Sequence, residues 1–385
     1  MVIYKYNSLW LTVYTLYRWL KCGKLYSRYY YWIILISFLL TFGFGCRTSS
    51  LPDNSSSRIR LIRDLKRLPT VRSVERWTLP DVIRERDRDG LSITTQHYQI
   101  HTSVRDPLIL RQVPVFLESA FRSYSALIGK SPQPKNTLLI YFFQTRSQWE
   151  DFTKHWTGEL APAYLKNPAG AYYFKNACVA YHLTRRSNFS ILAHEGWHQF
   201  ADELFQFRLP AWLDESIATN FEAYTWQNGR VEFDPRYNGS RLYALAQTLA
   251  QGRLISLSDL LVLDAGRILS HTQFDPADAK VDPRITAYYA QLYALARFLR
   301  EANYGRYLLS FRTMLTDAGY GRWPLDDASR AEALQRDRNP TRLWNAQVGQ
   351  LIFQTYIARD PREIEPAYQA FCRKIVANLQ FEKKL

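Results

Sequence analysis

Cysteines, acidic side chains and long apolar runs are all scarce in this sequence of 385 residues. Only four cysteines are present, and no two of them have the spacing of a zinc ribbon. Cys22 and Cys46 lie near the N-terminus, which leaves Cys178 and Cys372 as either one disulfide or two buried thiols. Internal repeats are also lacking, which excludes a solenoid.

Acidic residues do not balance the basic ones, since 35 Asp and Glu face 50 Lys and Arg for a net charge of +15. Part of this excess lies in the first 28 residues, and half of the remainder lies between Arg58 and Arg88. No nucleic-acid-binding motif accompanies the charge, so we expect no nucleic-acid partner. We attribute it to targeting and to a solvated or membrane-facing surface. The hydrophobic fraction of 47% excludes a disordered chain.

The one long apolar run extends from Tyr29 to Gly45, at the short end of the length that spans a bilayer. Basic residues precede it, and Cys46 with a polar tract follows it, as in a bacterial lipoprotein signal. A retained membrane helix is the alternative, because Gly43 and Phe44 depart from the usual lipoprotein pattern. We expect a membrane anchor in the bacterial cell envelope, Cys46 as the candidate lipid attachment site, and the remaining chain outside the cytoplasm.

The sequence predicts an α+β fold in which an N-terminal α/β part with a small mixed sheet precedes a mostly helical C-terminal part. Alternation and compact apolar runs predict strands within 91–103 and 136–143, and two strands within 170–183 that turn at Lys175-Asn176. Helical spacing predicts helices within 113–128 and 147–155, and beyond Ser190 only helices are expected. The later helices are predicted at 190–207, 211–226, 240–251, 284–301, 304–316 and 363–379.

Five segments follow from these patterns. They are a signal or anchor segment (1–46), a tether (47–57), a basic juxtamembrane region (58–90), an α/β part (91–226) and a helical part (227–385).

Two histidines have the spacing of a metal site. The segment ILAHEGWHQF places His194 and His198 four positions apart, on one face of a predicted helix. Catalytic zinc needs a third protein ligand, and the next predicted helix offers Glu215. Asp214 is its nearest competitor, but neighbouring helical side chains diverge by about 100°, so only one of the two can face the metal. We therefore expect a Zn²⁺ ion held by His194, His198 and Glu215.

Two further glutamates are assigned roles beside these ligands. Glu195 directly follows His194 and is predicted to be the general base that takes a proton from the attacking water. Glu222 lies farther along the predicted helix of Glu215, and we expect it to orient a ligand.

The pair of motifs HEGWH and WLDESIA resembles the gluzincins, the thermolysin-like clan of zinc metallopeptidases. More narrowly, it resembles bacterial envelope-associated proteins with HExxHQ and then P-x-WLxEGxA, although Ser216 stands where they have glycine. The resemblance again implies that Glu215 is the third ligand. It also implies that Tyr289 stabilises an oxyanion, with a role in the aromatic core as the alternative. The resemblance further implies that an edge strand within 169–179, before the zinc helix, binds an extended peptide. Asn176 or the main chain nearby would contact this substrate, with an ordinary core hairpin as the alternative.

These expectations define two hypotheses. The first is zinc-dependent hydrolysis of peptide bonds, with a peptide or protein as the substrate. The second is a non-catalytic envelope protein that zinc stabilises and that binds a peptide or protein partner.

Overall fold

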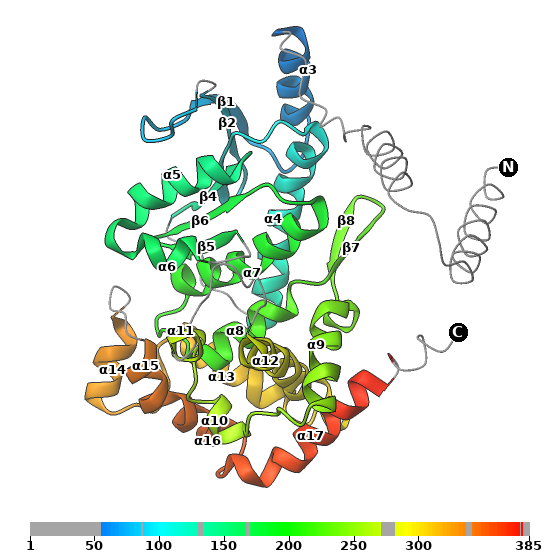
Figure 1. Cartoon of the computed structure of the whole chain (residues 1–385), viewed down its shortest axis with the longest axis vertical. Coiled ribbons are helices and arrows are strands. Elements are labelled where there is room, and N and C mark those ends of the chain that lie inside the picture. The colour runs from blue at the N-terminus through cyan, green and yellow to red at the C-terminus, as the bar shows by residue number, and fades with distance from the viewer. Residues whose placement is uncertain are drawn as a thin grey trace, which may run out of the picture. The chain divides into compact units, whose positions relative to one another are not determined.

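A computed structural model of the chain (Figure 1) describes residues 55–379 except 86–87, 130–133, 135, 167–169, 271–281, 336–340 and 378. The apolar run and Cys46 lie outside these residues. No helix among the described residues is long and apolar enough to cross a bilayer. Residues 51–385 form one compact unit.

The sheet has six strands in the order β1-β2-β3-β4-β6-β5. β4 is parallel to both β3 and β6, whereas the other neighbours are antiparallel, so the sheet is mixed. β5 lies at one edge. The strands are β1 (Ser73–Thr78), β2 (Asp89–Thr94), β3 (Tyr98–Thr102), β4 (Leu138–Phe143), β5 (Ala171–Phe174) and β6 (Ala177–Tyr181).

Helices cover both faces of this sheet. Alternate residues such as Ile100 and Ile140 belong to the main core with α4 (Pro107–Ile128) and α7 (Arg185–Leu204). The opposite residues, such as Phe143 and Val179, form a second core beneath α5 (Arg146–Thr157) and α6 (Ala161–Leu165). Successive residues of a strand point to opposite faces, and helices cover both faces of this sheet. Residues of both kinds are therefore apolar, which explains the compact apolar runs of the sequence.

The predicted α+β fold is confirmed. The expected hairpin turns at Lys175-Asn176, where φ values of 46° and 64° place both residues in the left-handed region. The segment expected to form a strand within 91–103 contains two strands, β2 and β3. Helix α4 begins six residues earlier than predicted, because Asp106 accepts hydrogen bonds from the main-chain N–H groups of Leu108 and Ile109.

The prediction that strands cease after residue 183 is wrong. β7 (Tyr224–Gln227) and β8 (Arg230–Phe233) form a hairpin around Asn228-Gly229, where both φ values are positive. The predicted helix at 211–226 therefore ends early, as α8 (Ala211–Asn220). Asn-Gly between alternating apolar residues is a strong hairpin signal.

The C-terminal part is helical, with α12 lying against α8 and α9 (Figure 1). Cys178 in β6 and Cys372 in α17 are both free and buried. The helices are α9 (Gly239–Ala250), α10 (Leu257–Leu260), α11 (Ala265–Ser270), α12 (Pro283–Glu301), α13 (Leu308–Gly319), α14 (Asp327–Leu334), α15 (Thr341–Trp344), α16 (Gln350–Tyr356) and α17 (Pro361–Ala377), with short turns η1 (Gly158–Leu160), η2 (Pro235–Tyr237), η3 (Ala302–Tyr304) and η4 (Asn345–Gly349).

The basic region at 58–90 contributes directly to the α/β part. It contains most of α3 (Ser55–Lys66) and all of β1, which pairs with β2. Leu61 and Leu65 of α3 are buried in the main core.

Candidate metal centre

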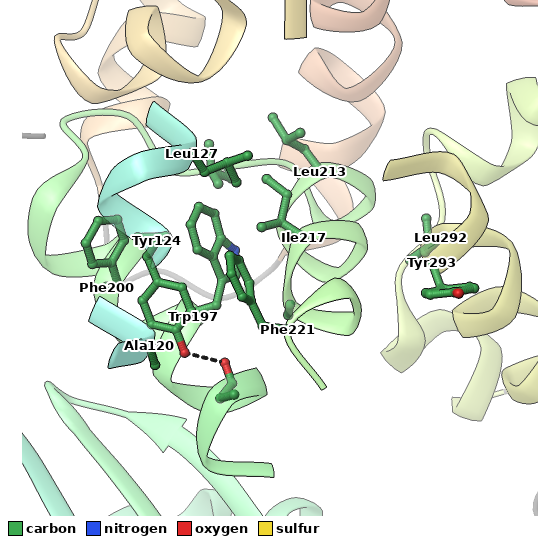
Figure 2. Packing of buried hydrophobic residues seen from close by; sticks show 14 of the residues in the cluster. Ala120, Tyr124, Leu127, Trp197, Phe200, Leu213, Ile217, Phe221, Leu292 and Tyr293 are labelled. Atoms are coloured by element: carbon green, nitrogen blue, oxygen red, sulfur yellow. Dashed lines mark hydrogen bonds between the residues drawn. The ribbon is translucent and has the colours of Figure 1, made fainter. Parts of the chain in front are cut away.

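Helix α7 is a buried element that carries His194 and His198. Thr184 caps its first turn by accepting a hydrogen bond from the Ser187 N–H. Figure 2 shows Trp197 of this helix among aromatic and aliphatic side chains from α4 and α8. The two histidine rings lie with their centroids 5.0 Å apart on the same side of the helix.

The glycine of HEGWH makes room for a contact between α4 and α7. Tyr124 of α4 donates its hydroxyl hydrogen to the Ala193 carbonyl at 2.6 Å (Figure 2). A Cβ on Gly196 would lie 3.0 Å from that hydroxyl oxygen. The absent side chain therefore lets α4 anchor the helix beside the two histidines of the candidate site.

Helix α8 brings Glu215 to the histidines. Helix α8 begins directly after Pro210, which is its N-cap. Trp212 in its first turn donates a hydrogen bond from Nε1 to the Gly349 carbonyl at 2.9 Å. Glu215 Oε2 lies 3.4 Å from His194 Nε2 and 3.6 Å from His198 Nε2. One ligand atom from each of the three residues lies within 4.8 Å of the other two.

Two other carboxylates form hydrogen bonds with the Nδ1 atoms of the imidazoles. Glu222 Oε1 lies 3.0 Å from His194 Nδ1, and Asp214 Oδ2 lies 2.9 Å from His198 Nδ1. An ionised carboxylate only accepts hydrogen bonds, so each Nδ1 carries the hydrogen and each Nε2 faces Glu215. Ligating histidines in metalloproteins have this arrangement.

The donor set fits a metal ion. Glu215 Oε2 is buried and has no hydrogen-bond partner among the described residues, although two Nε2 atoms face it. Three electron-rich atoms gathered in this way need a proton or a cation between them. Two imidazoles and one carboxylate match a catalytic zinc site, and other divalent ions bind the same ligand types.

The pKa values reflect this crowding. Burial alone would lower the pKa of His194, but the Glu215 and Glu222 carboxylates outweigh it and raise that pKa to about 9. Asp214 and Glu215 likewise overcome burial to raise the pKa of His198. In turn, the two histidines overcome the burial of Glu215 and hold its pKa below the usual range.

Glu195 lies on α7 between the two histidines, and burial raises its pKa despite their opposing charges. The main-chain N–H of Tyr173 donates a hydrogen bond to its carboxylate. Tyr173 belongs to β5, so the edge strand directs a main-chain donor towards this side of the site.

Tyr289 on α12 lies next to Arg241, whose guanidinium is over its ring. Burial raises its pKa, and the charge of Glu215 raises it further. Its hydroxyl makes no hydrogen bond to a described residue. By contrast, Tyr288 donates to the Leu263 carbonyl at 3.4 Å and Tyr293 donates to the Pro235 carbonyl at 2.6 Å, so both are tied to the core.

Glu222 lies in the turn after α8, whereas the sequence placed it on the helix. Its main-chain carbonyl accepts a hydrogen bond from Ser190 Oγ at 2.7 Å, which ties this turn to α7. Asn176 lies in the β5–β6 turn, and its carbonyl accepts a hydrogen bond from Gln199 Nε2 at 3.0 Å. Its side chain is exposed, and Asn176 is not one of the three residues whose ligand atoms gather.

Sequence reasoning missed two residues that hold Glu222. Arg241 of α9 donates to both Glu222 oxygens, at 2.6 and 2.8 Å, and its guanidinium lies 5.1 Å from the centre of the Tyr289 ring. Asn238 Nδ2 donates to Glu222 Oε2 at 3.0 Å. Asn238 could have been noticed as the cap of α9, whereas no local signal connects Arg241 with Glu222.

No protein-family model matches the chain, and no curated protein matches its sequence.

Proposed function

We propose that this chain is a zinc-dependent peptidase of the gluzincin type. The observation that carries the proposal is the convergence of His194 Nε2, His198 Nε2 and Glu215 Oε2, with each Nδ1 occupied by a carboxylate. Three protein ligands leave a fourth position free, as catalytic zinc requires. Zinc bound there would polarise a substrate carbonyl and lower the pKa of water towards 7.

Glu195 is proposed as the general base. Its raised pKa suits a group that accepts a proton from water and later returns it to the leaving amine. The Tyr173 N–H fixes the carboxylate beside the two histidines. Tyr289 is proposed to donate a hydrogen bond to the developing oxyanion, because its hydroxyl has no hydrogen-bond partner in the described part of the chain.

The substrate is proposed to be an extended peptide that pairs with β5. This strand lies at the sheet edge, and its Tyr173 N–H, which is bound to Glu195, places the strand beside the proposed general base. Asn176 in the adjoining turn is proposed to contact the same peptide. We further propose that the N-terminal segment anchors the protein in the bacterial envelope, with this site outside the cytoplasm.

The test is cleavage of a diverse peptide library by the full zinc-loaded chain. Glu195→Gln should retain zinc and lose turnover by about 10²–10⁴-fold, because it removes the proton acceptor. Glu232→Gln, on the exposed side of β8, is the matched control and should cleave like the wild type. Cleavage that Glu195→Gln leaves unchanged would refute the mechanism. A zinc-bound chain that cleaves nothing would favour the non-catalytic alternative.

A further inference from the structure

The exposed face of α3 carries several cations, with Asp64 as the one acid of the helix at its margin. The opposite face places Leu61 and Leu65 in the core, with exposed fractions of 4% and 0%. Positions three and four apart share a side of a helix, so the exposed residues form one continuous surface. This cationic face consists of Arg60, Arg63, Lys66 and, just after the helix, Arg67.

Two nearby acidic residues form ion pairs with arginines outside this face. Asp64 pairs with Arg111 of α4 at 2.7 Å, and Asp89 pairs with Arg58 at 2.8 Å. None of the four cations in the cationic face forms an ion pair with a described residue. Like charges at this spacing destabilise a helix, so a polyanion would stabilise α3.

A strand that contacts α3 carries another exposed cation. Arg76 of β1 is exposed, and it shares a side of the strand with Val74, which is buried in the same core as Leu61. The cations of α3 and β1 therefore lie on one side of the sheet.

We propose that the cationic face of α3 binds the anionic headgroup surface of a lipid bilayer. Ile59, which is 63% exposed next to Arg60, is an apolar side chain that can enter the headgroup layer. Only residues 46–54 separate the run 29–45 from α3, because the last part of the expected tether belongs to the helix. Such a segment spans at most about 30 Å, so chain connectivity keeps α3 near any bilayer that the run enters. Basic clusters beside a membrane segment bind anionic lipids, and this inference rests on the proposed anchoring.

The test uses the full chain with bilayers of phosphatidylcholine alone or mixed equally with phosphatidylglycerol. Flotation of the protein with either bilayer reports anchoring. Amide hydrogen exchange of 55–66 reports docking and should slow at least about fivefold in the anionic bilayer, with reversal in high salt. Exchange in α17 should be the same in both bilayers.

A triple variant and a matched control distinguish the effect of this face from the effect of net charge. Arg60→Gln, Arg63→Gln and Lys66→Gln together should abolish the lipid-dependent protection, because each cation contributes about fivefold to binding. The control triple, Arg253→Gln, Arg312→Gln and Lys374→Gln, removes the same charge from exposed positions of the helical part and should leave the protection intact.

Three results of the exchange experiment would overturn the proposal. They are equal exchange of 55–66 in the two bilayers, equal loss of protection in the two triple variants, and protection of 55–66 by double-stranded DNA but not by anionic lipid. A chain that floats with neither bilayer would overturn both docking and anchoring. A chain that floats with both but shows no protection would overturn docking alone.

Discussion

Asp214 offers a sharp test of how the candidate metal centre is organised. Its Oδ2 lies 2.9 Å from His198 Nδ1, and its Oδ1 accepts a hydrogen bond from Trp197 Nε1 at 2.8 Å. Asp214→Asn keeps the shape of the side chain but replaces one acceptor oxygen with an NH₂ group. One of the two donors then loses its partner, and His198 is no longer held in the orientation and tautomer that expose Nε2.

The expected loss is about 10–100-fold in zinc affinity, or about 1.4–2.7 kcal/mol. The assay is competition for zinc against a chelator of known affinity, with the melting temperature of the metal-free protein measured in parallel. Asp317→Asn is the control, because Asp317 also accepts two side-chain hydrogen bonds, from Arg322 and Tyr356. The control should lose stability without losing zinc affinity. Zinc affinity within twofold of wild type for Asp214→Asn would refute the reasoning.

Three further predictions concern the surroundings of the site. Arg241→Met should lower the free energy of unfolding by about 3 kcal/mol in urea denaturation, because it leaves the Glu222 carboxylate without its cation. It should also weaken zinc binding about tenfold, and Arg241→Lys should recover part of both losses; an unchanged affinity would contradict this role. Zinc binding at pH 7 should release about two protons in calorimetry across several buffers, because the pKa of His194 is raised to about 9 and that of His198 is also raised. Apparent zinc affinity should therefore increase with pH up to about pH 9, and binding without proton release would contradict it. Gly196→Ala should destabilise the fold by up to about 2 kcal/mol, since a clash of about 1–3 kcal/mol with the Tyr124 hydroxyl exceeds the helix-propensity gain of about 1 kcal/mol. Urea denaturation of the double variant with Tyr124→Phe should show less than the sum of the two losses, and strict additivity would rule the clash out.

The parts of the fold that depend on local pattern could be predicted from the sequence. His194 and His198 lie one turn apart on a single helix, and the α8 segment follows directly, so neighbouring positions in the chain place all three ligand atoms together. The Lys175-Asn176 turn was likewise visible between two apolar runs.

Features that depend on distant parts of the chain could not be predicted in this way. Phe221, Tyr224 and Trp226 fit a continued helical pattern, which concealed the end of α8 and the β7–β8 hairpin. That hairpin returns the chain so that Arg241 reaches Glu222, a contact with no local signal. Strand β1 was not predicted from the sequence, because its buried residue Val74 is followed by the exposed charged residues Glu75 and Arg76.

The most direct test of the central claim is the zinc content of the purified full chain by mass spectrometry, compared with Glu215→Gln and Glu195→Gln. The account predicts one zinc per chain in the wild type and in Glu195→Gln. It predicts at least tenfold weaker binding in Glu215→Gln, because Glu215 supplies the third ligand atom of the candidate group. A folded wild-type chain that holds no divalent metal after incubation with zinc would contradict it, as would unchanged zinc binding by Glu215→Gln.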